Sequence, residues 1–244
     1  MFVQKKTGET TSELSERIKK ENNFTKLAIC GKLDPMARGL TRILADKNTK
    51  FMSKNLNHNK TYNFNIVLNI KTDTDDILGL IKNVKDQFSS INLVYKFLES
   101  LKYEKMQHFH PVSAIKIKKN GVRKSLHQWS LSESLTTDMI PKKKVTVYSV
   151  NYQNYTKINT DSYIKLVKSK LSTISKNNIN TFRVPSIMED WNNFQVKYPN
   201  IKELYVIPVT MQVSSGYYIR MISYYLSSRL NILSHIYDIE RIQC

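Results

Sequence analysis

An alternation of apolar with mostly polar residues between positions 61 and 70, broken only by Val67, constrains the fold more than any other feature of the sequence. The apolar positions of this run are Tyr62, Phe64, Ile66, Leu68 and Ile70. Successive side chains of a strand point to opposite faces of a sheet, so this period of two predicts a strand with one apolar face. Residues 205–213 repeat the pattern and predict a second strand of the same kind.

Apolar residues at helical spacing predict helices along the rest of the chain. One helix is expected to begin at Thr10-Thr11-Ser12 and another directly after Asp34-Pro35. Further helices are expected over residues 91–103, over residues 161–175 with Asp161 as the cap, and after Gly216.

Shorter strands are expected over residues 112–118 and 145–152, whereas residues 180–203 show no clear period. Strands and helices that mix without regular βαβ alternation favour the α+β class. A chain of 244 residues can form one large core, and the sequence contains neither a repeat nor a linker rich in proline, glycine or serine. Residues 1–244 are therefore expected to form a single domain.

The sequence is strongly basic, with 38 lysine and arginine residues against 20 aspartate and glutamate residues, a formal net charge of +18 and a pI near 9.7. This balance favours a nucleic-acid partner, with an anionic membrane surface or an acidic protein as weaker alternatives. An AT-rich genome, which enriches lysine, asparagine and isoleucine, is another source of such charge. The basic residues gather in two runs, namely Lys116, Lys118, Lys119, Arg123 and Lys124, and Lys142, Lys143 and Lys144. Residues 117–144 are therefore expected to form a basic excursion between two strands.

The sequence lacks the usual features of membrane and secreted proteins. No apolar run approaches the ~18 residues that a membrane span needs, and the first residues lack the apolar stretch of a signal peptide. Two cysteines, Cys30 and Cys244, form neither a disulfide framework nor a metal cluster. We expect an intracellular, reducing compartment, with the cytoplasm and an organelle such as the mitochondrion both open. His108 and His110 have no cysteine or acidic partner at ligand spacing, so they are expected to be surface or RNA-facing side chains rather than metal ligands.

Asp34 and Pro35 form a pair with a defined local geometry. The residue before a proline is pushed toward extended backbone, and proline suits the first turn of a helix. Asp34 is therefore expected to end a loop and to cap the helix that carries Met36, Ala37 and the apolar residues after them. Helix amides and the helix dipole keep a carboxylate ionised in that position. Taken alone, the pair indicates no more than a helix start.

Residues 31–40, Gly-Lys-Leu-Asp-Pro-Met-Ala-Arg-Gly-Leu, resemble the catalytic-aspartate motif of the TruB-type tRNA pseudouridine synthases. Further segments resemble motifs of this family and follow in the same order. They are Lys5 with Gly8, Thr10 and Thr11, Lys60-Thr61-Tyr62, Thr72-Asp73-Thr74 with Asp76 and Gly79, Ser113-Ala114-Ile115-Lys116 with Gly121, Thr146-Val147-Tyr148, Gly216-Tyr217-Tyr218-Ile219-Arg220, and His235 with Ile239 and Arg241. The resemblance therefore extends over nearly the whole chain.

The sequence also departs from the family pattern. The family histidine is absent, because Ala28-Ile29-Cys30-Gly31 stands where the family has Gly-His-Thr-Gly. Pro111-Val112 replaces a proline–aromatic pair. Between Tyr148 and Gly216 the chain is longer than the compact members by roughly 45 residues, which places a family-atypical insertion over residues 152–203. No PUA-like tail follows Arg241, so the catalytic domain alone is expected.

The resemblance implies a pseudouridine synthase-like fold, with a mixed, largely antiparallel central sheet flanked by helices. It also implies isomerisation of a flipped-out uridine without cofactor or metal, with the T-loop uridine of tRNA as the target. Asp34 would act as nucleophile or base, Arg220 would neutralise and orient it, and Tyr62 would stack on the base and offer a hydroxyl near C5. The residues implied to bind substrate are Gly31, Leu33, Lys60, Ile239, Lys116, Arg123, Lys142, Lys143, Lys144 and Arg241.

The implied partner is the T-arm of tRNA, bound by a monomer or within a larger ribonucleoprotein, with residues 117–144 gripping its phosphates. The alternative is a catalytically inactive TruB-like RNA-binding protein, such as an RNA chaperone or a ribonucleoprotein component. The absent histidine and the insertion keep this alternative open, whereas the retention of Asp34, Tyr62 and Arg220 together argues against it. A basic membrane-surface protein is disfavoured because the sequence has no basic amphipathic helix of sufficient length.

Overall fold

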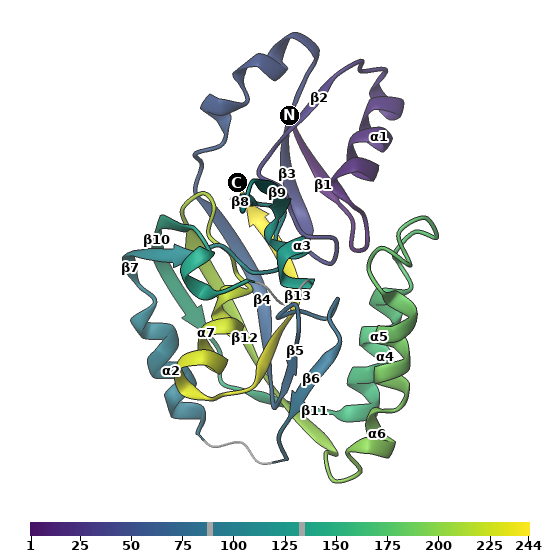
Figure 1. The fold of residues 1–244 in the computed structure, drawn as a ribbon, viewed down its shortest axis with the longest axis vertical. Coiled ribbons are helices and arrows are strands. Elements are labelled where there is room, and N and C mark those ends of the chain that lie inside the picture. The colour runs from purple at the N-terminus through teal and green to yellow at the C-terminus, as the bar shows by residue number, and fades with distance from the viewer. Residues whose placement is uncertain (87–89, 132–134) are drawn as a thin grey trace.

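The structure, a computed structural model, describes residues 1–86, 90–131 and 135–244. Its centre is a nine-stranded sheet with the order β1-β3-β13-β4-β12-β10-β7, in which β2 also pairs with β3 and β11 with β12 (Figure 1). Its strands are β1 (Phe2–Lys5), β2 (Leu27–Cys30), β3 (Arg38–Ala45), β4 (Lys60–Leu68), β7 (Tyr103–His108), β10 (Lys142–Tyr152), β11 (Thr156–Asn159), β12 (Glu203–Val213) and β13 (Ser234–Gln243). Two separate hairpins pair β5 (Ile70–Thr72) with β6 (Ile81–Val84) and β8 (Lys116–Lys119) with β9 (Val122–Ser125).

The helices are α1 (Thr11–Asn22), α2 (Ile91–Ser100), α3 (Leu126–Leu131), α4 (Thr160–Leu171), α5 (Val184–Asn192), α6 (Phe194–Lys197) and α7 (Met221–Leu230). The helices expected near Thr10, over residues 91–103 and after Gly216 are thus confirmed. Strands β4 and β12 confirm the two alternating runs, and in the central sheet only the β3–β13 pair is parallel among the strands described. No helix in the part of the chain that the structure describes is long and apolar enough to cross a membrane.

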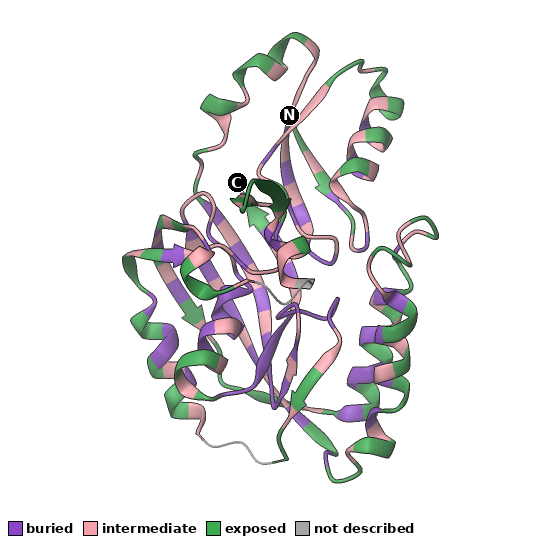
Figure 2. Ribbon diagram, viewed as in Figure 1, coloured by how far each residue is buried: buried purple, intermediate pink, exposed green. Residues whose placement is uncertain are grey.

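Two helical layers cover the central sheet, one on each face. On one face, Tyr62, Phe64 and Ile66 of β4 pack in a core with apolar residues of α2 and α7. On the other face, Val67 of β4 packs in a second core with α4, α5 and α6. Figure 1 shows the two layers on either side of the sheet, and Figure 2 shows the buried residues gathered on the strands and on the helix surfaces that face them.

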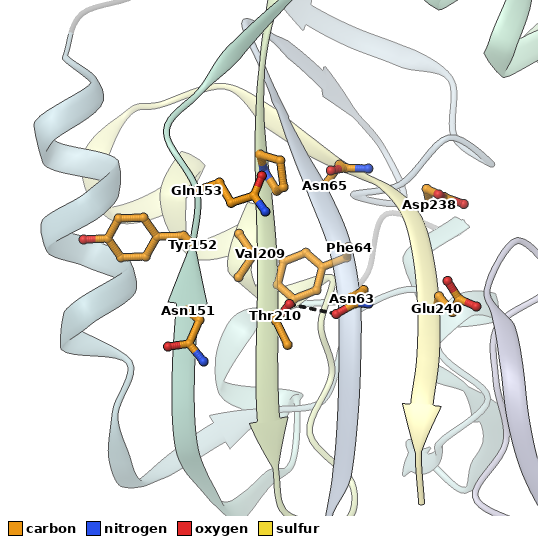
Figure 3. A pocket seen from close by; sticks show the side chains of 11 residues that line it. Asn63, Phe64, Asn65, Asn151, Tyr152, Gln153, Val209, Thr210, Asp238 and Glu240 are labelled. Atoms are coloured by element: carbon orange, nitrogen blue, oxygen red, sulfur yellow. Dashed lines mark hydrogen bonds between the residues drawn. The ribbon is translucent and has the colours of Figure 1, made fainter.

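The second face is open beside the α4–α5 layer, where polar side chains line a cavity of about 310 Å³. Figure 3 shows Asn63 of β4, Asn151 of β10 and Thr210 of β12 in this cavity, and Thr210 Oγ1 donates a hydrogen bond of 2.7 Å to Asn63 Oδ1. Asn63 follows Tyr62 in β4, so the alternation of the strand places this amide-rich surface opposite the face that carries Tyr62.

The prediction that Asp34 caps a helix is wrong, because strand β3 follows Asp34-Pro35 instead of a helix. The Ala37 amide donates to Asp34 O at 3.0 Å, so residues 34–37 form a turn. An acid at the first position and a proline at the second favour a β-turn as much as a helix start. Gly39 then adopts a φ of +114°, and the backbone of Arg241 in β13 lies so close that a Cβ on Gly39 would be 2.3 Å from Arg241 O. Contact with β13 therefore directs the chain into the sheet.

Three predicted boundaries also differ from the structure. The strand expected over residues 112–118 begins only at Lys116. Lys142, Lys143 and Lys144 belong to β10, where they pair with β7, so the second basic run lies in the central sheet and not in the excursion. Asn159 rather than Asp161 caps α4, because its side chain accepts the Ser162 amide at 3.1 Å.

Residues 180–203, for which no period was predicted, contain the short helices α5 and α6. Val184, Ile187, Trp191 and Phe194 are all buried and do recur at helical spacing. Pro185 lies in the first turn of α5, where a proline removes no helical hydrogen bond. Pro185 therefore marks a helix start inside a segment for which no clear period was found.

The segment expected to be an insertion, residues 152–203, is joined to the sheet by a buried polar contact. The hydroxyl oxygen of Tyr163 in α4 lies 2.6 Å from Nε2 of His235 in β13, and both side chains are almost fully buried. His235 Nδ1 lies 2.9 Å from Ile70 O, which can only accept, so Nδ1 carries the proton and Nε2 accepts from the tyrosine hydroxyl. Burial lowers the pKa of His235 to about 4, so the ring is neutral near pH 7.

We expect Tyr163→Phe to lower the free energy of unfolding by about 1–3 kcal/mol, because it leaves His235 Nε2 buried without a partner. Urea unfolding at pH 7 measures the change. Tyr148→Phe is the matched control, since Tyr148 is 49% exposed. Equal midpoints for the two variants would contradict the assignment of this contact.

Candidate active site

A cavity of about 450 Å³ lies where the Asp34 turn, the first residues of β4 and the start of α7 meet. Its walls come from segments that are far apart in the sequence. The lining residues are Thr10, Thr11, Gly31, Lys32, Leu33, Asp34, Pro35, Ala37, Lys60, Tyr62, Ser113, Ala114, Phe182, Ser215, Gly216, Tyr217, Tyr218, Ile219, Arg220, Ile239 and Arg241. The structure therefore brings Asp34, Tyr62 and Arg220 to one cavity.

Asp34 and Arg220 form an ion pair in the wall of this cavity. Arg220 Nε donates to Asp34 Oδ2 at 2.8 Å, and the side chain of Arg220 is 5% exposed whereas that of Asp34 is 41% exposed. The remaining guanidinium donors bind backbone, with Nη1 at 2.9 Å from Thr74 O and Nη2 at 3.1 Å from Val112 O. Arg220 is therefore fixed from behind, and the carboxylate of Asp34 is the member of the pair that a ligand can reach.

A second carboxylate, Asp76, lies behind the pair. Its Oδ2 is 3.7 Å from Arg220 Nε, while its Oδ1 accepts from Thr74 Oγ1 at 2.7 Å and from the Leu78 amide at 2.9 Å. Burial raises the pKa of Asp76 to about 6, and the nearby charge of Asp34 acts in the same direction. Two acids therefore share one arginine, and only the exposed one faces the cavity. The resemblance had marked Asp76 as part of a motif but had given it no place in the site.

His110 supports the same arginine, and the prediction that it is a surface or RNA-facing side chain is wrong. It is 1% exposed, and its Nε2 lies 3.0 Å from Asp75 Oδ2. Its Nδ1 accepts from the Val112 amide at 3.0 Å and lies 3.2 Å from Arg220 Nη1. Burial and the charge of Arg220 lower the pKa of His110 to about 4, so the ring is neutral near pH 7. Asp75 and His110 are 35 positions apart in the sequence, so no local pattern relates them.

Buried cations hold the turn that carries Asp34. Lys5, which is 2% exposed, donates from Nζ to Pro35 O at 3.0 Å and to Ala37 O at 2.7 Å. Arg241, which is 1% exposed, donates from Nη1 to Gly31 O at 3.1 Å. Burial lowers the pKa of Lys5 to about 8. Strand β1 is thus tied to the turn itself and strand β13 to the residue three positions before Asp34, and both contacts hold the backbone on either side of Asp34.

The walls beside Asp34 are mainly apolar. Leu33, Tyr62 and Ile239 are each less than 9% exposed and line the cavity. Burial raises the pKa of Tyr62 above its usual value, so the phenol keeps its proton near neutral pH. Lys60 also lines the cavity, but its Nζ donates to His58 O at 2.8 Å, and burial lowers its pKa. These groups form an apolar slot with one exposed acid.

The lysine and arginine residues of the two basic runs, which were predicted to bind substrate, lie at different distances from the cavity. Lys143 lies over Gly216 at the cavity rim, where a Cβ on the glycine would be 2.2 Å from Lys143 Nζ. Lys142 is exposed on the same strand, and Lys144 forms an ion pair of 2.8 Å with Glu104. Lys116 lines a neighbouring cavity, while Arg123 is exposed on β9 and lines neither cavity. Among the described residues, no three histidine, cysteine or acidic side chains gather as a metal site.

Comparison with known proteins relates the chain to pseudouridine synthases in sequence and to a chain of a Cbf5-Nop10-Gar1 complex in fold. The profile of the TruB family pseudouridylate synthase N-terminal domain matches residues 19–171. A tRNA pseudouridine synthase B from Mycoplasma capricolum is 30% identical over 163 residues, which cover 66% of this chain and 54% of the relative. A tRNA pseudouridine synthase B from Caldicellulosiruptor saccharolyticus is 33% identical over 155 residues, which cover 64% of this chain and 52% of the relative. A chain in the crystal structure of a Cbf5-Nop10-Gar1 complex has a TM-score of 0.53 at 15% identity, covering 98% of this chain and 46% of that chain.

The fold and the site define an α+β domain in which an arginine holds an exposed aspartate beside an apolar slot. The matched profile takes in more than half of the chain, including Asp34 and Tyr62, and the chain belongs to the TruB family of pseudouridylate synthases. It spans about half the length of the curated relatives that it matches. The family and the α+β fold with a mixed, largely antiparallel sheet, both predicted from the sequence, are confirmed.

Proposed function

We propose that this protein is an RNA pseudouridine synthase that isomerises a uridine of tRNA, with the T-loop uridine as the target and Asp34 as the catalytic aspartate. One observation carries the proposal: Asp34 is held at 2.8 Å by a buried arginine and is 41% exposed toward a cavity lined by Tyr62. Membership of the TruB family and relatives named tRNA pseudouridine synthase B support the reaction and the substrate class.

The reaction needs one carboxylate and no co-reactant. The bond between C1′ of the ribose and N1 of the uracil breaks, the base turns, and a bond forms between C1′ and C5. The proton leaves C5 and N1 gains one, so the reaction is an isomerisation without an oxidant or reductant. Asp34 acts on the sugar or the base as nucleophile or as base, and Arg220 keeps its carboxylate oriented.

The apolar slot suits a base that has left its stack. The reactive atoms of a uridine are shielded in a folded RNA loop, so the nucleotide is flipped into the cavity before reaction. Tyr62 offers a ring on which the base stacks, and such contacts contribute about 1–3 kcal/mol per base. Leu33 and Ile239 exclude water from the sides of the slot. The same walls keep Asp34 close to the sugar.

Release of tritium from tRNA labelled at C5 of its uridines tests the proposal, because the hydrogen on C5 is lost when C5 becomes the glycosidic carbon and a reaction without a methyl donor excludes its loss by methylation. We expect one equivalent of tritium per tRNA from unmodified transcripts, and none from a transcript in which the T-loop uridine is replaced by cytidine. Binding of tRNA without any release would overturn the proposal and would favour the non-catalytic RNA-binding alternative.

We expect the triple variant Lys142→Ala, Lys143→Ala, Lys144→Ala to bind tRNA more weakly and with a shallower salt dependence. Each phosphate contact contributes about 0.7–0.9 to the slope of log K against log salt, so the slope should fall by about 2–3. Lys82, Lys165 and Lys202 are exposed and line neither cavity, so their triple alanine variant removes the same charge as a control. Equal slopes for the two variants would remove Lys142–Lys144 from the interface.

A further inference from the structure

A second cavity of about 550 Å³ adjoins the one that holds Asp34. The two cavities share wall residues, namely Asp34, Pro35, Ser113, Ala114, Phe182 and Arg220. One side of the second cavity comes from β8, β9 and α3, with Lys116, Ser125, His127 and Gln128 in its wall. Another part of its wall comes from residues 181–183, which belong to the segment expected to be a family-atypical insertion.

Contacts at both ends fix this loop of the insertion, residues 178–183, beside the site. Asn178 Nδ2 donates to Glu13 Oε1 of α1 at 3.0 Å. Arg183 donates to both carboxylate oxygens of Asp73, with Nη1 at 2.8 Å from Oδ2 and Nη2 at 3.1 Å from Oδ1. Asp73 lies directly before Thr74, whose carbonyl binds Arg220. The insertion is thus anchored to the same turn that positions Arg220.

Phe182 lies between these two anchors and lines both cavities. Its side chain is half-buried: part of the ring packs against the core shared with α4 and α5, and the rest lines the cavities. The wall of the second cavity also contains the ammonium group of Lys116 and the side-chain amide of Gln128. Gln128 Oε1 accepts from Ser125 Oγ at 3.1 Å, so the amide presents its Nε2 donors to a ligand. An aromatic ring with an adjoining cation and neutral hydrogen-bonding groups is the combination that binds a nucleotide of single-stranded RNA.

The connection between the cavities limits what the second one can bind. The two share Asp34 and Arg220, so a strand that places its uridine against Asp34 brings the adjoining nucleotide to the mouth of the second cavity. The acid Asp76, which also lines this cavity, is 5% exposed and turned toward Arg220, so it does not oppose a phosphate at the surface.

We propose that the second cavity binds the nucleotide next to the target uridine, with its base stacked on Phe182, so that the insertion is part of the RNA-binding surface. The inference rests on the proposed function in one respect, which is that the ligand is an RNA containing the target uridine. It assigns a substrate-binding role to residues 178–183, a loop that neither the family motifs nor the basic runs include.

Fluorescence of 2-aminopurine tests this inference through binding, independently of catalysis. The probe replaces, one at a time, the nucleotides on either side of the target uridine in a T-arm hairpin. We expect a fluorescence change on binding at one of the two positions. Phe182→Ala should abolish that change and weaken binding about 10-fold or more, whereas Phe182→Tyr should retain both.

Two further variants separate stacking from loop structure. Phe182→Leu keeps an apolar side chain without a ring, and we expect it to resemble Phe182→Ala. Phe51→Ala removes a 41% exposed phenylalanine outside both cavities and should resemble the unaltered protein. A Phe182→Leu or Phe182→Ala protein with unaltered fluorescence and affinity would overturn the inference.

The two proposals fail in different ways. Tritium release by the unaltered protein, together with Phe182 variants that bind normally, would overturn the second site and leave the proposed function intact. A fluorescence change that depends on Phe182, in a protein that releases no tritium, would support the second site and overturn the proposed function. Absence of binding to the hairpin by the unaltered protein would overturn both.

Discussion

Asp34→Asn should abolish tritium release from tRNA while leaving tRNA affinity within about threefold of the unaltered protein. Asparagine has nearly the shape of aspartate, and its Oδ1 can still accept the hydrogen bond from Arg220 Nε, which is 2.8 Å from the carboxylate in the native site. It carries no charge and is neither a nucleophile nor a base. A general base contributes about 10²–10⁴-fold to a rate, and loss of a nucleophile removes the reaction path itself. Tritium release should therefore fall by at least about 10²-fold if Asp34 is the base, and should cease if it is the nucleophile.

The binding measurement decides how the loss of activity is interpreted. The walls of the slot and the exposed cations do not depend on the charge of Asp34, so affinity should persist. Asp161→Asn, at an exposed acid in the first turn of α4, is the matched control and should release tritium at the normal rate. Measurable product from Asp34→Asn would remove Asp34 from the chemistry, and loss of binding would assign it to recognition instead.

The parts of the fold that local patterns control could be predicted from the sequence. The alternation in β4 and β12 predicts two strands, because a period of two places all the apolar side chains of a strand on one face of a sheet. The structure pairs these two strands with each other. The helix start at Thr10 was also local, since Thr10 and Glu13 form a capping box. The resemblance to a family went further, because its motifs brought Asp34, Tyr62 and Arg220 together from distant positions, and these residues do line one cavity.

Features that depend on contacts between distant residues could not be predicted. Asp34-Pro35 is compatible with a helix start and with a turn, and the choice depends on Arg241, whose backbone packs against Gly39. His110 had no acidic partner nearby in the sequence, yet Asp75 lies 3.0 Å away because two turns meet behind Arg220. The charge of a lysine likewise does not predict whether its ammonium group is open to substrate. Lys143 lies at the cavity rim, whereas the ammonium group of Lys60 already binds a backbone carbonyl.

Arg220→Lys should lower both activity and stability, because all three nitrogen atoms of the guanidinium group donate hydrogen bonds. The arginine donates to Asp34, Thr74 O and Val112 O, which lie in three separate segments. An ammonium group is a compact point charge, and it cannot reach three acceptors that a planar fork spans. Since 5% exposure prevents water from replacing the lost donors, at least one carbonyl would remain unpaired.

We expect Arg220→Lys to reduce the rate of tritium release by at least about 10²-fold and the free energy of unfolding by about 2–4 kcal/mol. Arg229→Lys, at an exposed position near the end of the same helix, is the control and should change neither quantity appreciably. A variant with normal stability and lost activity would mean that Arg220 acts on Asp34 alone. Loss of both quantities would mean that one side chain joins the Asp34 turn to the segments behind it, so that the site cannot be positioned unless this part of the core is intact.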